Sequence, residues 1–497
     1  METKTVHRIF AAFFLIVFSV LVSWRASHIG NFADDFDFLV RRTHSISAHD
    51  IFLKNTDGTN FGGSWRPLTM LTFVVSMEHS VSVALYGICA IFIFLIAEHI
   101  FGTEKKIALA AMIIFLLIPI HAEPVMWIAA RADVLAGAFA LASLYAWIRG
   151  VRVLAFVCFI ASLLAKEVWV LLPIAFLFFD HEHNRAAPRL ILKWASIFFI
   201  TIVIWFLFRR YITSFGIGGY SIPTIFDAHI FARIGKAIVS YIVGVFTYGI
   251  TQAAAVRWAT LHFKILCVGA VAGAVIVWRA TPHGYKFLWI AHAGVLAPIL
   301  LLEVPFQRVM ASVGEQRYWF APSAILVLLL AALVFSYIKK PQFELSIIAI
   351  IIAYFSIGFV TNVAYFSAAA KYRDTIITAW SGADSVVALP DTYHGVHMFA
   401  APFFYDALVL AHKNPPEKIV PWYQYCSSAC STEPLIVLPT INRVVISASQ
   451  PRLIHVGEHG LRHIVELSNS SSSTLAIWNG AQFIQIPPQA VENHYIK

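Results

Sequence analysis

The sequence predicts an all-α membrane protein that crosses the bilayer many times and carries a small C-terminal domain. Of its 497 residues, 59% are hydrophobic and only 13% are charged, whereas soluble domains carry about a quarter charged residues. The mean hydropathy is +0.74, and apolar runs recur that are long enough to cross a hydrocarbon layer of ~30 Å. These runs are continuous and do not alternate, so we expect helices and not a barrel.

We expect residues 1–380 to form a bundle of about 11 transmembrane helices. The first span covers residues 8–24, and Lys4 and Arg8 place the N-terminus in the cytoplasm, because cytoplasmic ends of spans are enriched in Lys and Arg. No small-x-small cleavage site follows this span, which predicts an uncleaved anchor. Residues 25–80 then form a long extracytoplasmic loop.

The middle of the chain leaves one choice of topology open. The basic groups at residues 279–286 and 339–340 both face the cytoplasm only if the apolar residues 236–256 do not span the membrane. We therefore expect residues 236–256 to form an interfacial or re-entrant helix. The alternative is a full span, which inverts the topology of its neighbours.

The composition changes near residue 381, and residues 381–497 predict a small extracytoplasmic domain of β or α/β type. Short β-type runs, such as residues 386–390 and 443–446, are separated by Pro, Gly and Ser. Cys426 and Cys430 lie four apart in this region and could form a disulfide if it faces an oxidising compartment. A zinc site is disfavoured, because no second Cys/His pair with ligand spacing is evident. The other three cysteines lie in apolar runs, where we expect small core residues.

The charge and the motifs exclude several classes of protein. The net charge of +9 does not imply a nucleic-acid partner, because an excess of Lys and Arg in a membrane protein reports orientation and contact with anionic lipid. No Walker A, GxGxxG or HExxH motif occurs. Acidic residues within the predicted spans are few, which disfavours an ion-coupled transporter.

The most polar feature of the first outer loop is an acidic cluster. Asp34, Asp35 and Asp37 alternate with Phe side chains in residues 31–39. Two adjacent carboxylates at a membrane face can serve as a general base and its orienter, or as metal ligands. Partial burial and mutual repulsion raise the pKa of one member of such a pair. The alternative is a solvated loop cluster without a chemical role.

Further charged residues lie at the predicted outer ends of spans. His121 and Glu123 follow the third span, where they either complete a two-acid site or cap a helix beside Pro124. Arg131 and Asp133 are close in sequence, and the simplest alternative to a role in the site is that they pair with each other or cap the next helix.

Two cations are candidates for binding a phosphate. Lys166 stands between two short apolar runs, and either a phosphate or its neighbour Glu167 would be its partner. Arg317 precedes an inward span and either binds a phosphate with two hydrogen bonds or anchors the interface together with Tyr318 and Trp319.

Five motifs within residues 31–323 resemble, in order, those of the transmembrane O-mannosyltransferases with C-terminal tetratricopeptide repeats, and more broadly those of the GT-C glycosyltransferases. They are Asp34-Asp35, Trp65-Arg-Pro-Leu-Thr69, His121-Ala-Glu-Pro-Val125 with Ala130-Arg-Ala-Asp-Val-Leu135, Lys166-Glu167, and residues 315–323. The last motif carries one extra residue, Gln316, between its Glu and its Arg. The resemblance covers the membrane domain only, since residues 381–497 show no helical repeat of about 34 residues.

The resemblance implies a GT-C type bundle with hexosyl- or mannosyltransferase activity, as in protein O-mannosylation. The donor would be a sugar on polyprenyl or dolichyl phosphate, and a hydroxyl of a protein, glycan or lipid would accept it with inversion of the sugar carbon. The general base would be Asp35 or Asp34, and Lys166 and Arg317 would hold the leaving lipid phosphate. The other motif residues expected to bind substrate are Arg66, His121, Glu123 and Arg131.

No cofactor is certain. Use of a divalent metal stays open, with Asp34, Asp35 and Glu123 as the ligands it would have. We expect a multi-pass protein of a bacterial inner membrane, in contact with the lipid bilayer and with its active site facing outward. Two other classes remain as alternatives, namely a transporter or flippase of lipid-linked sugars and an assembly protein of the cell envelope.

Overall fold

The structure is a computed structural model of the full chain, and most of the described residues are helical. The residues that it describes are 2–42, 46–54, 64–102, 105–213, 230–248, 258, 262–301, 313–337, 341–381 and separate stretches between 385 and 486. Several predicted features therefore lie outside the described residues, among them Cys426, Cys430 and the side chain of Glu315.

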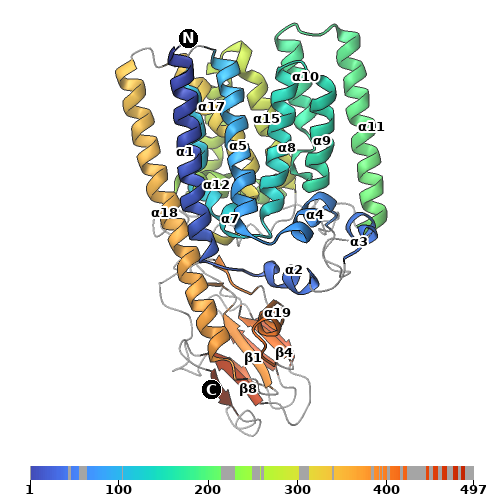
Figure 1. The fold of residues 1–497 in the computed structure, drawn as a ribbon, viewed down its shortest axis with the longest axis vertical. Coiled ribbons are helices and arrows are strands. Elements are labelled where there is room, and N and C mark those ends of the chain that lie inside the picture. Colours follow the sequence, from blue (N-terminus) through green and yellow to red (C-terminus); the bar gives the residue numbers. More distant parts are fainter. Residues whose placement is uncertain are drawn as a thin grey trace. The chain divides into compact units, whose positions relative to one another are not determined.

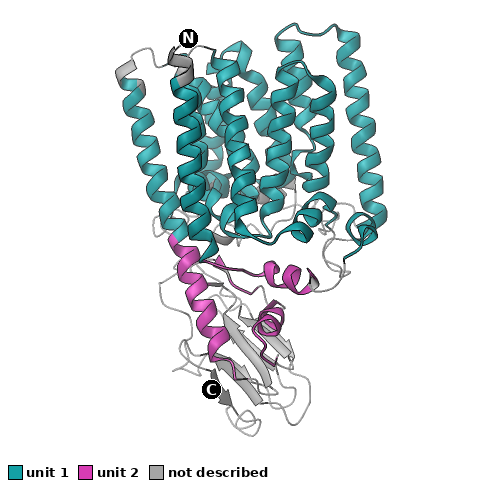
Figure 2. Ribbon diagram, viewed as in Figure 1, with its two compact units in different colours: residues 1–28, 45–363 teal, residues 29–44, 364–497 magenta. Residues whose placement is uncertain are grey.

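The chain forms two compact units (Figure 2). Unit 1 comprises residues 1–28 and 45–363, and unit 2 comprises residues 29–44 and 364–497. The chain passes from unit 1 to unit 2 just after the first helix, and a second time within the last long helix.

Unit 1 is a bundle of helices that run side by side, with short helices across one end (Figure 1). Its helices and 3-10 turns are α1 (Glu2–Ser27), α3 (Ala48–Leu53), α4 (Pro67–Val75), α5 (His79–Phe101), α6 (Lys105–Leu117), η1 (Pro119–His121), α7 (Ala122–Met126), α8 (Arg131–Ile148), α9 (Arg152–Ala165), η2 (Glu167–Trp169), α10 (Leu172–Glu182), α11 (Pro188–Thr213), α12 (Ile230–Phe246), α14 (Phe263–Ala280), η4 (His283–Tyr285), α15 (Lys286–Leu301), η5 (Val313–Trp319), α17 (Phe320–Tyr337) and the first part of α18 (Pro341–Ala379).

Six helical segments among the described residues are long and apolar enough to cross a membrane. They are Val6–Ser27, His79–Phe101, Arg131–Ile148, Pro188–Thr213, Gln316–Val334 and Leu345–Ala379. The bent pair of α6 with η1 and α7 makes seven if it counts as one span. The chain is thus a membrane protein with several candidate spans, while the number of about 11 stays a prediction.

The helix that begins at Lys105 breaks at Pro119. The segments on either side of the break are bent by 56°, because proline lacks the N–H that would continue the helix. Asn362 of α18 donates its side-chain Nδ2 to the carbonyl oxygen of Pro119 at 2.9 Å. The break brings η1 and α7 across the end of the bundle, so that the predicted motif at residues 121–125 is helical and buried.

Helix α8 forms the centre of unit 1 and is buried along most of its length. Two serines fasten it to α9, since Ser162 donates to the carbonyl of Ala136 at 2.9 Å and Ser143 donates to that of Ala155 at 2.6 Å. Gly137 lets the ring of Phe320 approach so closely that a Cβ atom there would lie 2.7 Å from it. This packing fixes the start of α8 against the end of α9.

Helix α12 covers Ile230–Phe246 and is shorter than the predicted apolar segment 236–256, of which residues 249–256 lie outside the described residues. It is not among the candidate spans. The prediction of an interfacial or re-entrant helix therefore stays a prediction.

Unit 2 contains α2 (Asp34–Arg42), the end of α18, α19 (Phe403–Leu410) and nine described strands. Strands β1 (Ser385–Pro390), β4 (Lys418–Trp422), β8 (Thr474–Trp478) and β9 (Phe483–Ile486) form one sheet in the order β4-β1-β8-β9. Its β1–β4 and β1–β8 pairs are parallel and its β8–β9 pair is antiparallel. The other strands are β2 (Thr392–Tyr393), β3 (Val396–His397), β5 (Val444–Ile446), β6 (Arg452–Val456) and β7 (Arg462–Glu466). The interpretation of residues 381–497 as a separate extracytoplasmic domain stays a prediction.

Candidate functional site

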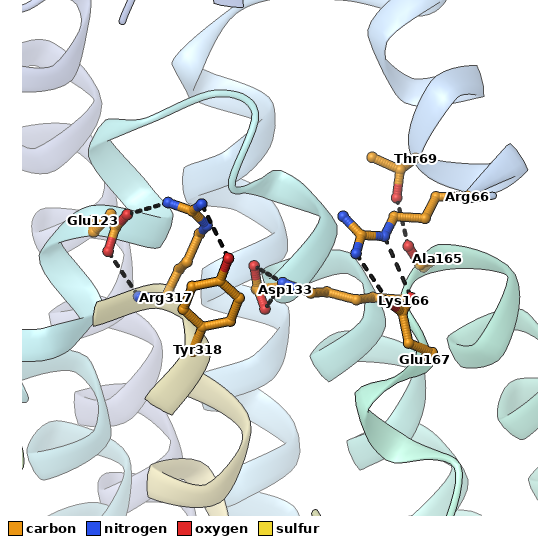
Figure 3. A network of polar contacts seen from close by, with 9 residues as sticks. All are labelled: Arg66, Thr69, Glu123, Asp133, Ala165, Lys166, Glu167, Arg317 and Tyr318. Atoms are coloured by element: carbon orange, nitrogen blue, oxygen red, sulfur yellow. Dashed lines mark hydrogen bonds and ion pairs between the residues drawn. The ribbon is translucent and has the colours of Figure 1, made fainter. Parts of the chain in front are cut away.

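Charged side chains from widely separated parts of the sequence meet at one end of unit 1 (Figure 3, which does not draw Arg209). We call this group the ion-pair network. Its members are Arg66, Glu123, Asp133, Lys166, Glu167, Arg209, Arg317 and the aromatic Tyr318. Four of the predicted site residues, Arg66, Glu123, Lys166 and Arg317, are therefore brought together.

Lys166 lies directly after α9 and pairs with Asp133 in the first turn of α8. Its Nζ atom is 2.5 and 2.6 Å from the two carboxylate oxygens, and the side chains are 8% and 3% exposed. Burial lowers the pKa of Lys166, and the Asp133 carboxylate opposes that shift. The alternative pairings of Lys166 with Glu167 and of Asp133 with Arg131 are wrong, because packing of α8 on α9 brings Asp133 to Lys166.

Glu167 faces two arginines instead. Arg66 donates to it from Nη2 at 3.1 Å, and Arg209 at the end of α11 lies 3.7 Å away. Burial raises the pKa of Glu167, but the two guanidinium groups outweigh burial and hold the pKa below its usual range. Thr69 donates its hydroxyl to the carbonyl of Ala165 at 2.9 Å, which fastens the Arg-Pro-Leu-Thr segment to the end of α9.

Arg317 is fixed by Glu123, which has no exposed surface. One carboxylate oxygen accepts from the backbone N–H of Arg317 and the other from its Nη1, both at 2.7 Å. The guanidinium carbon lies 4.2 Å from the ring centroid of Trp127 and 4.9 Å from that of Tyr318. The side chain nevertheless keeps 19% of its surface exposed, so Arg317 is positioned without being fully enclosed.

Tyr318 connects the two halves of the network, because Lys166 Nζ lies 5.3 Å from the same ring centroid as Arg317. Each of these cations has its own fixed carboxylate, Asp133 for Lys166 and Glu123 for Arg317. Cations held in place before a reaction stabilise developing negative charge without reorganisation. The network can therefore bind an anionic group such as a phosphate.

Arg131 makes contacts that favour a structural role. It is buried and donates to the carbonyl oxygens of Ser76 at 2.5 Å and Glu78 at 2.7 Å. It also donates to the carbonyl of Thr72 at 3.3 Å and to the hydroxyl of Ser82 at 3.1 Å. These contacts satisfy carbonyls at and beyond the C-terminus of α4, as a C-terminal cap does.

His121 is likewise enclosed by protein groups. Its Nδ1 atom lies 2.9 Å from the hydroxyl of Tyr86 and 2.8 Å from the carbonyl of Phe115. Its Nε2 atom lies 2.7 Å from the hydroxyl of Ser323. The ring thus connects η1 with α5, α6 and α17, and its predicted contact with substrate stays a prediction.

The acidic cluster belongs to unit 2, where Asp34, Asp35 and Asp37 lie in the first turn of α2. Backbone N–H groups at a helix N-terminus stabilise negative charge. Asp35 has no exposed surface and its Oδ2 atom accepts the N–H of Phe32 at 3.0 Å. Asp34 and Asp37 are partly exposed. Asp35 is therefore enclosed, whereas Asp34 keeps access to solvent.

Arg373, near the end of α18, holds the turn that leads into α2. Its guanidinium donates to the carbonyl oxygen of Ile29 at 3.0 Å and to that of Asn31, and it lies 4.9 Å from the ring centroid of Phe32. Gly30 has a φ of +71°, and a Cβ atom there would lie 3.2 Å from Nη2 of Arg373. The close approach of Arg373 thus depends on glycine at this turn.

Sequence reasoning missed Arg209 and Arg373. Arg209 ends a span that we expect to run outward, and a basic residue at that end departs from the usual enrichment in the cytoplasm. That departure could have indicated that Arg209 has an acidic partner near the network. Arg373 lies beyond the last apolar run expected to span, residues 344–366, and nothing in its local sequence indicates the turn that it contacts.

The described residues offer few metal-ligating side chains close together. Among the residues that the structure describes, no group of three or more His, Cys, Asp or Glu side chains could hold a metal ion. Both carboxylate oxygens of Glu123 accept hydrogen bonds from Arg317. The side chains of the network therefore do not fit a resident metal.

The long apolar helices indicate a membrane protein, and the network gathers four cations and three carboxylates at one end of unit 1. Comparison of the chain with models of known protein families finds no match, and comparison with curated proteins finds none either.

Proposed function

We propose that the chain is a membrane glycosyltransferase that moves a sugar from a polyprenyl or dolichyl phosphate to a hydroxyl of a protein, glycan or lipid. The observation that carries this proposal is the fixed pair of cations beside Tyr318. Lys166 and Arg317 are each held by a buried carboxylate and both lie within 5.3 Å of one ring centroid.

A lipid phosphate is the leaving group that suits these cations. As the bond between the sugar carbon and the phosphate oxygen breaks, negative charge develops on the phosphate. Arg317 presents a planar guanidinium whose geometry matches phosphate oxygens, and Lys166 adds a point charge. Removal of one preorganised donor of this kind typically costs about 100- to 1000-fold in kcat, so either cation makes a large contribution.

The proposed general base is Asp35 or Asp34, in the first turn of α2. The carboxylate accepts the proton of the acceptor hydroxyl, the hydroxyl oxygen forms a bond to the anomeric carbon, and the phosphate leaves with the electron pair of the broken bond. This single displacement inverts the anomeric carbon. The enclosure of Asp35 and the partial exposure of Asp34 suit an orienter beside a solvent-accessible base.

The membrane setting supports a lipid-linked donor. Unit 1 exposes large apolar side chains along several helices, among them α11 and α18, and such surfaces contact lipid tails. A polyprenyl chain dissolved in the bilayer reaches the end of the bundle without leaving the hydrocarbon. The inner membrane of a bacterium and an outward-facing site remain part of the proposal.

The test is donor consumption by the purified protein in detergent with a panel of polyprenyl-phosphate sugars and an extract of candidate acceptors. The variants are Asp35→Ala and Arg317→Ala, and the matched control is Arg8→Ala. Arg8 pairs with Glu98 at 3.0 Å but its side chain is 62% exposed, so its loss removes an arginine ion pair away from the network. We expect one donor to be consumed, and Asp35→Ala and Arg317→Ala each to lose at least about 100-fold in rate.

The alternatives make different predictions in the same assay. A flippase of lipid-linked sugars would leave every donor of the panel intact. An assembly protein would be indifferent to Asp35→Ala. If no donor of a broad panel is consumed, or if the two variants match Arg8→Ala, the glycosyltransferase proposal is wrong.

A further inference from the structure

Two side-chain amides lie buried next to each other beside the ion-pair network. Gln316 of η5 is 2% exposed and Asn362 of α18 has no exposed surface. Nδ2 of Asn362 donates to the carbonyl oxygen of Pro119 at 2.9 Å and to Oε1 of Gln316 at 3.2 Å. Burying a side-chain amide costs free energy unless its polar atoms are hydrogen-bonded.

The orientation of both amides follows from Pro119. A carbonyl oxygen can only accept, so the Asn362 atom that faces it must be the NH₂ nitrogen. The Gln316 atom that faces the same nitrogen must then be an acceptor, which is Oε1. The hydrogen bonds thus determine which atom of each amide is the nitrogen and which is the oxygen.

One donor and one acceptor remain after these bonds are counted. Nε2 of Gln316 and Oδ1 of Asn362 are both buried and have no hydrogen-bond partner within the part of the chain that the structure describes. Each atom is bonded to the same amide carbon as one of the two atoms joined by the 3.2 Å hydrogen bond. Buried polar groups of this kind are nearly always satisfied by some partner.

The partner that fits is a hydroxyl group. A hydroxyl accepts from Nε2 and donates to Oδ1 at the same time. A carboxylate or phosphate has no proton to donate to Oδ1, and an ammonium cannot accept from Nε2. The chemistry of the two atoms thus selects a neutral group that is both donor and acceptor.

We propose that Gln316 and Asn362 form a subsite that binds one hydroxyl of the donor sugar. The inference rests on the proposed function, and it names a determinant of sugar specificity. Gln316 directly precedes Arg317, the residue assigned to the lipid phosphate, and the sugar is bonded to that phosphate. The hydroxyls of a hexose therefore lie within a few ångströms of the phosphate group, as this subsite requires.

The experiment compares the donor that the wild-type protein uses with a set of its analogues, each lacking one hydroxyl. A site built to hydrogen-bond a hydroxyl discriminates strongly against the analogue that lacks it. We expect one analogue to lose at least about 100-fold in kcat/KM with the wild type. With Asn362→Leu and Gln316→Met, which keep the volume but remove the polar atoms, that ratio falls to less than about threefold.

Thr361→Val is the matched control. Its hydroxyl donates to Ile357 within its own helix at 2.7 Å, so the control changes a polar residue of α18 next to Asn362. It should keep the full discrimination. If both subsite variants keep the discrimination, or if no analogue is discriminated against by the wild type, a buried water is the partner and the proposal is overturned.

Binding is measured in parallel, as the rise in unfolding temperature with each donor and analogue. If the wild type turns over no donor, the proposed function has failed, and the subsite is judged on binding alone. The subsite then predicts a rise for the full sugar that one deoxy analogue does not produce. Equal rises for all analogues overturn it. If both variants fail to fold, the wild-type analogue series still decides.

Discussion

Replacement of Lys166 and Asp133, singly and together, separates a catalytic cation from a structural ion pair. Lys166→Met leaves the Asp133 carboxylate, which is 3% exposed, without its partner. Asp133→Leu leaves the Lys166 ammonium, which is 8% exposed, in the same position. The double variant replaces the pair with two apolar side chains of similar volume.

The expected magnitudes follow from the burial of both groups. Removal of one partner of a buried pair typically costs about 3–5 kcal/mol, because the other charge stays buried and uncompensated. Replacement of the whole pair by apolar side chains is often close to neutral. We therefore expect each single variant to lose about 3–5 kcal/mol in free energy of unfolding, and the double variant to recover most of that loss.

Activity is expected to behave differently from stability. If Lys166 stabilises the leaving phosphate, the double variant regains its fold and stays about 100-fold or more below the wild type in kcat. Unfolding in mixed detergent micelles measures the stability, and donor consumption measures the activity. A double variant that regains both stability and activity would show that Lys166 only holds the helices together, and the reasoning would be refuted.

Three further predictions use other contacts. Arg317→Lys should lower kcat by about 10- to 100-fold, because a lysine cannot keep the paired hydrogen bonds of a guanidinium; a rate equal to the wild type would contradict this. The pKa of Glu167 is lowered in the folded state. The ionised carboxylate should therefore stabilise the fold by a constant amount above pH ~5, and this contribution should be lost only as the pH falls through and below ~4.5. The measurement is the difference in unfolding free energy between the wild type and Glu167→Gln. A difference that declines already near pH 7 would oppose it. Gly30→Ala should cost about 1–2 kcal/mol and also reduce turnover, since its Cβ would press on Arg373, whereas Gly150→Ala, at a φ of +82° with open space, should cost stability alone.

Helix positions were largely predictable, because long apolar runs in a membrane protein have only one common conformation. The apolar runs predict further spans at residues 82–100, 264–278, 319–338 and 344–366. The first two lie within α5 and α14, and the third exceeds α17 by one residue at each end. The expected span at 344–366 is longer, since α18 continues to Ala379. Hydropathy marks where a chain enters lipid, and it does not mark where a helix ends in water.

The partners within the site were less predictable. Lys166 stands beside Glu167 in sequence, yet it pairs with Asp133 because α8 packs on α9. Residues Glu123 and Arg317 were both expected in the site, but their contact joins segments 194 residues apart. The capping role of Arg131 depends on the end of α4, which only the packing of α4 near α8 brings close. Local sequence cannot supply such contacts.

The most direct test of the central claim is a donor that carries one label on the sugar and another on the phosphate. Purified protein is reconstituted in vesicles with this donor and an extract of candidate acceptors, and both labels are followed. The account predicts that the sugar label moves to the acceptor while the phosphate label stays with the lipid, and that Arg317→Ala abolishes this separation. If the two labels never separate and move together across the bilayer, the chain is a flippase and not a transferase.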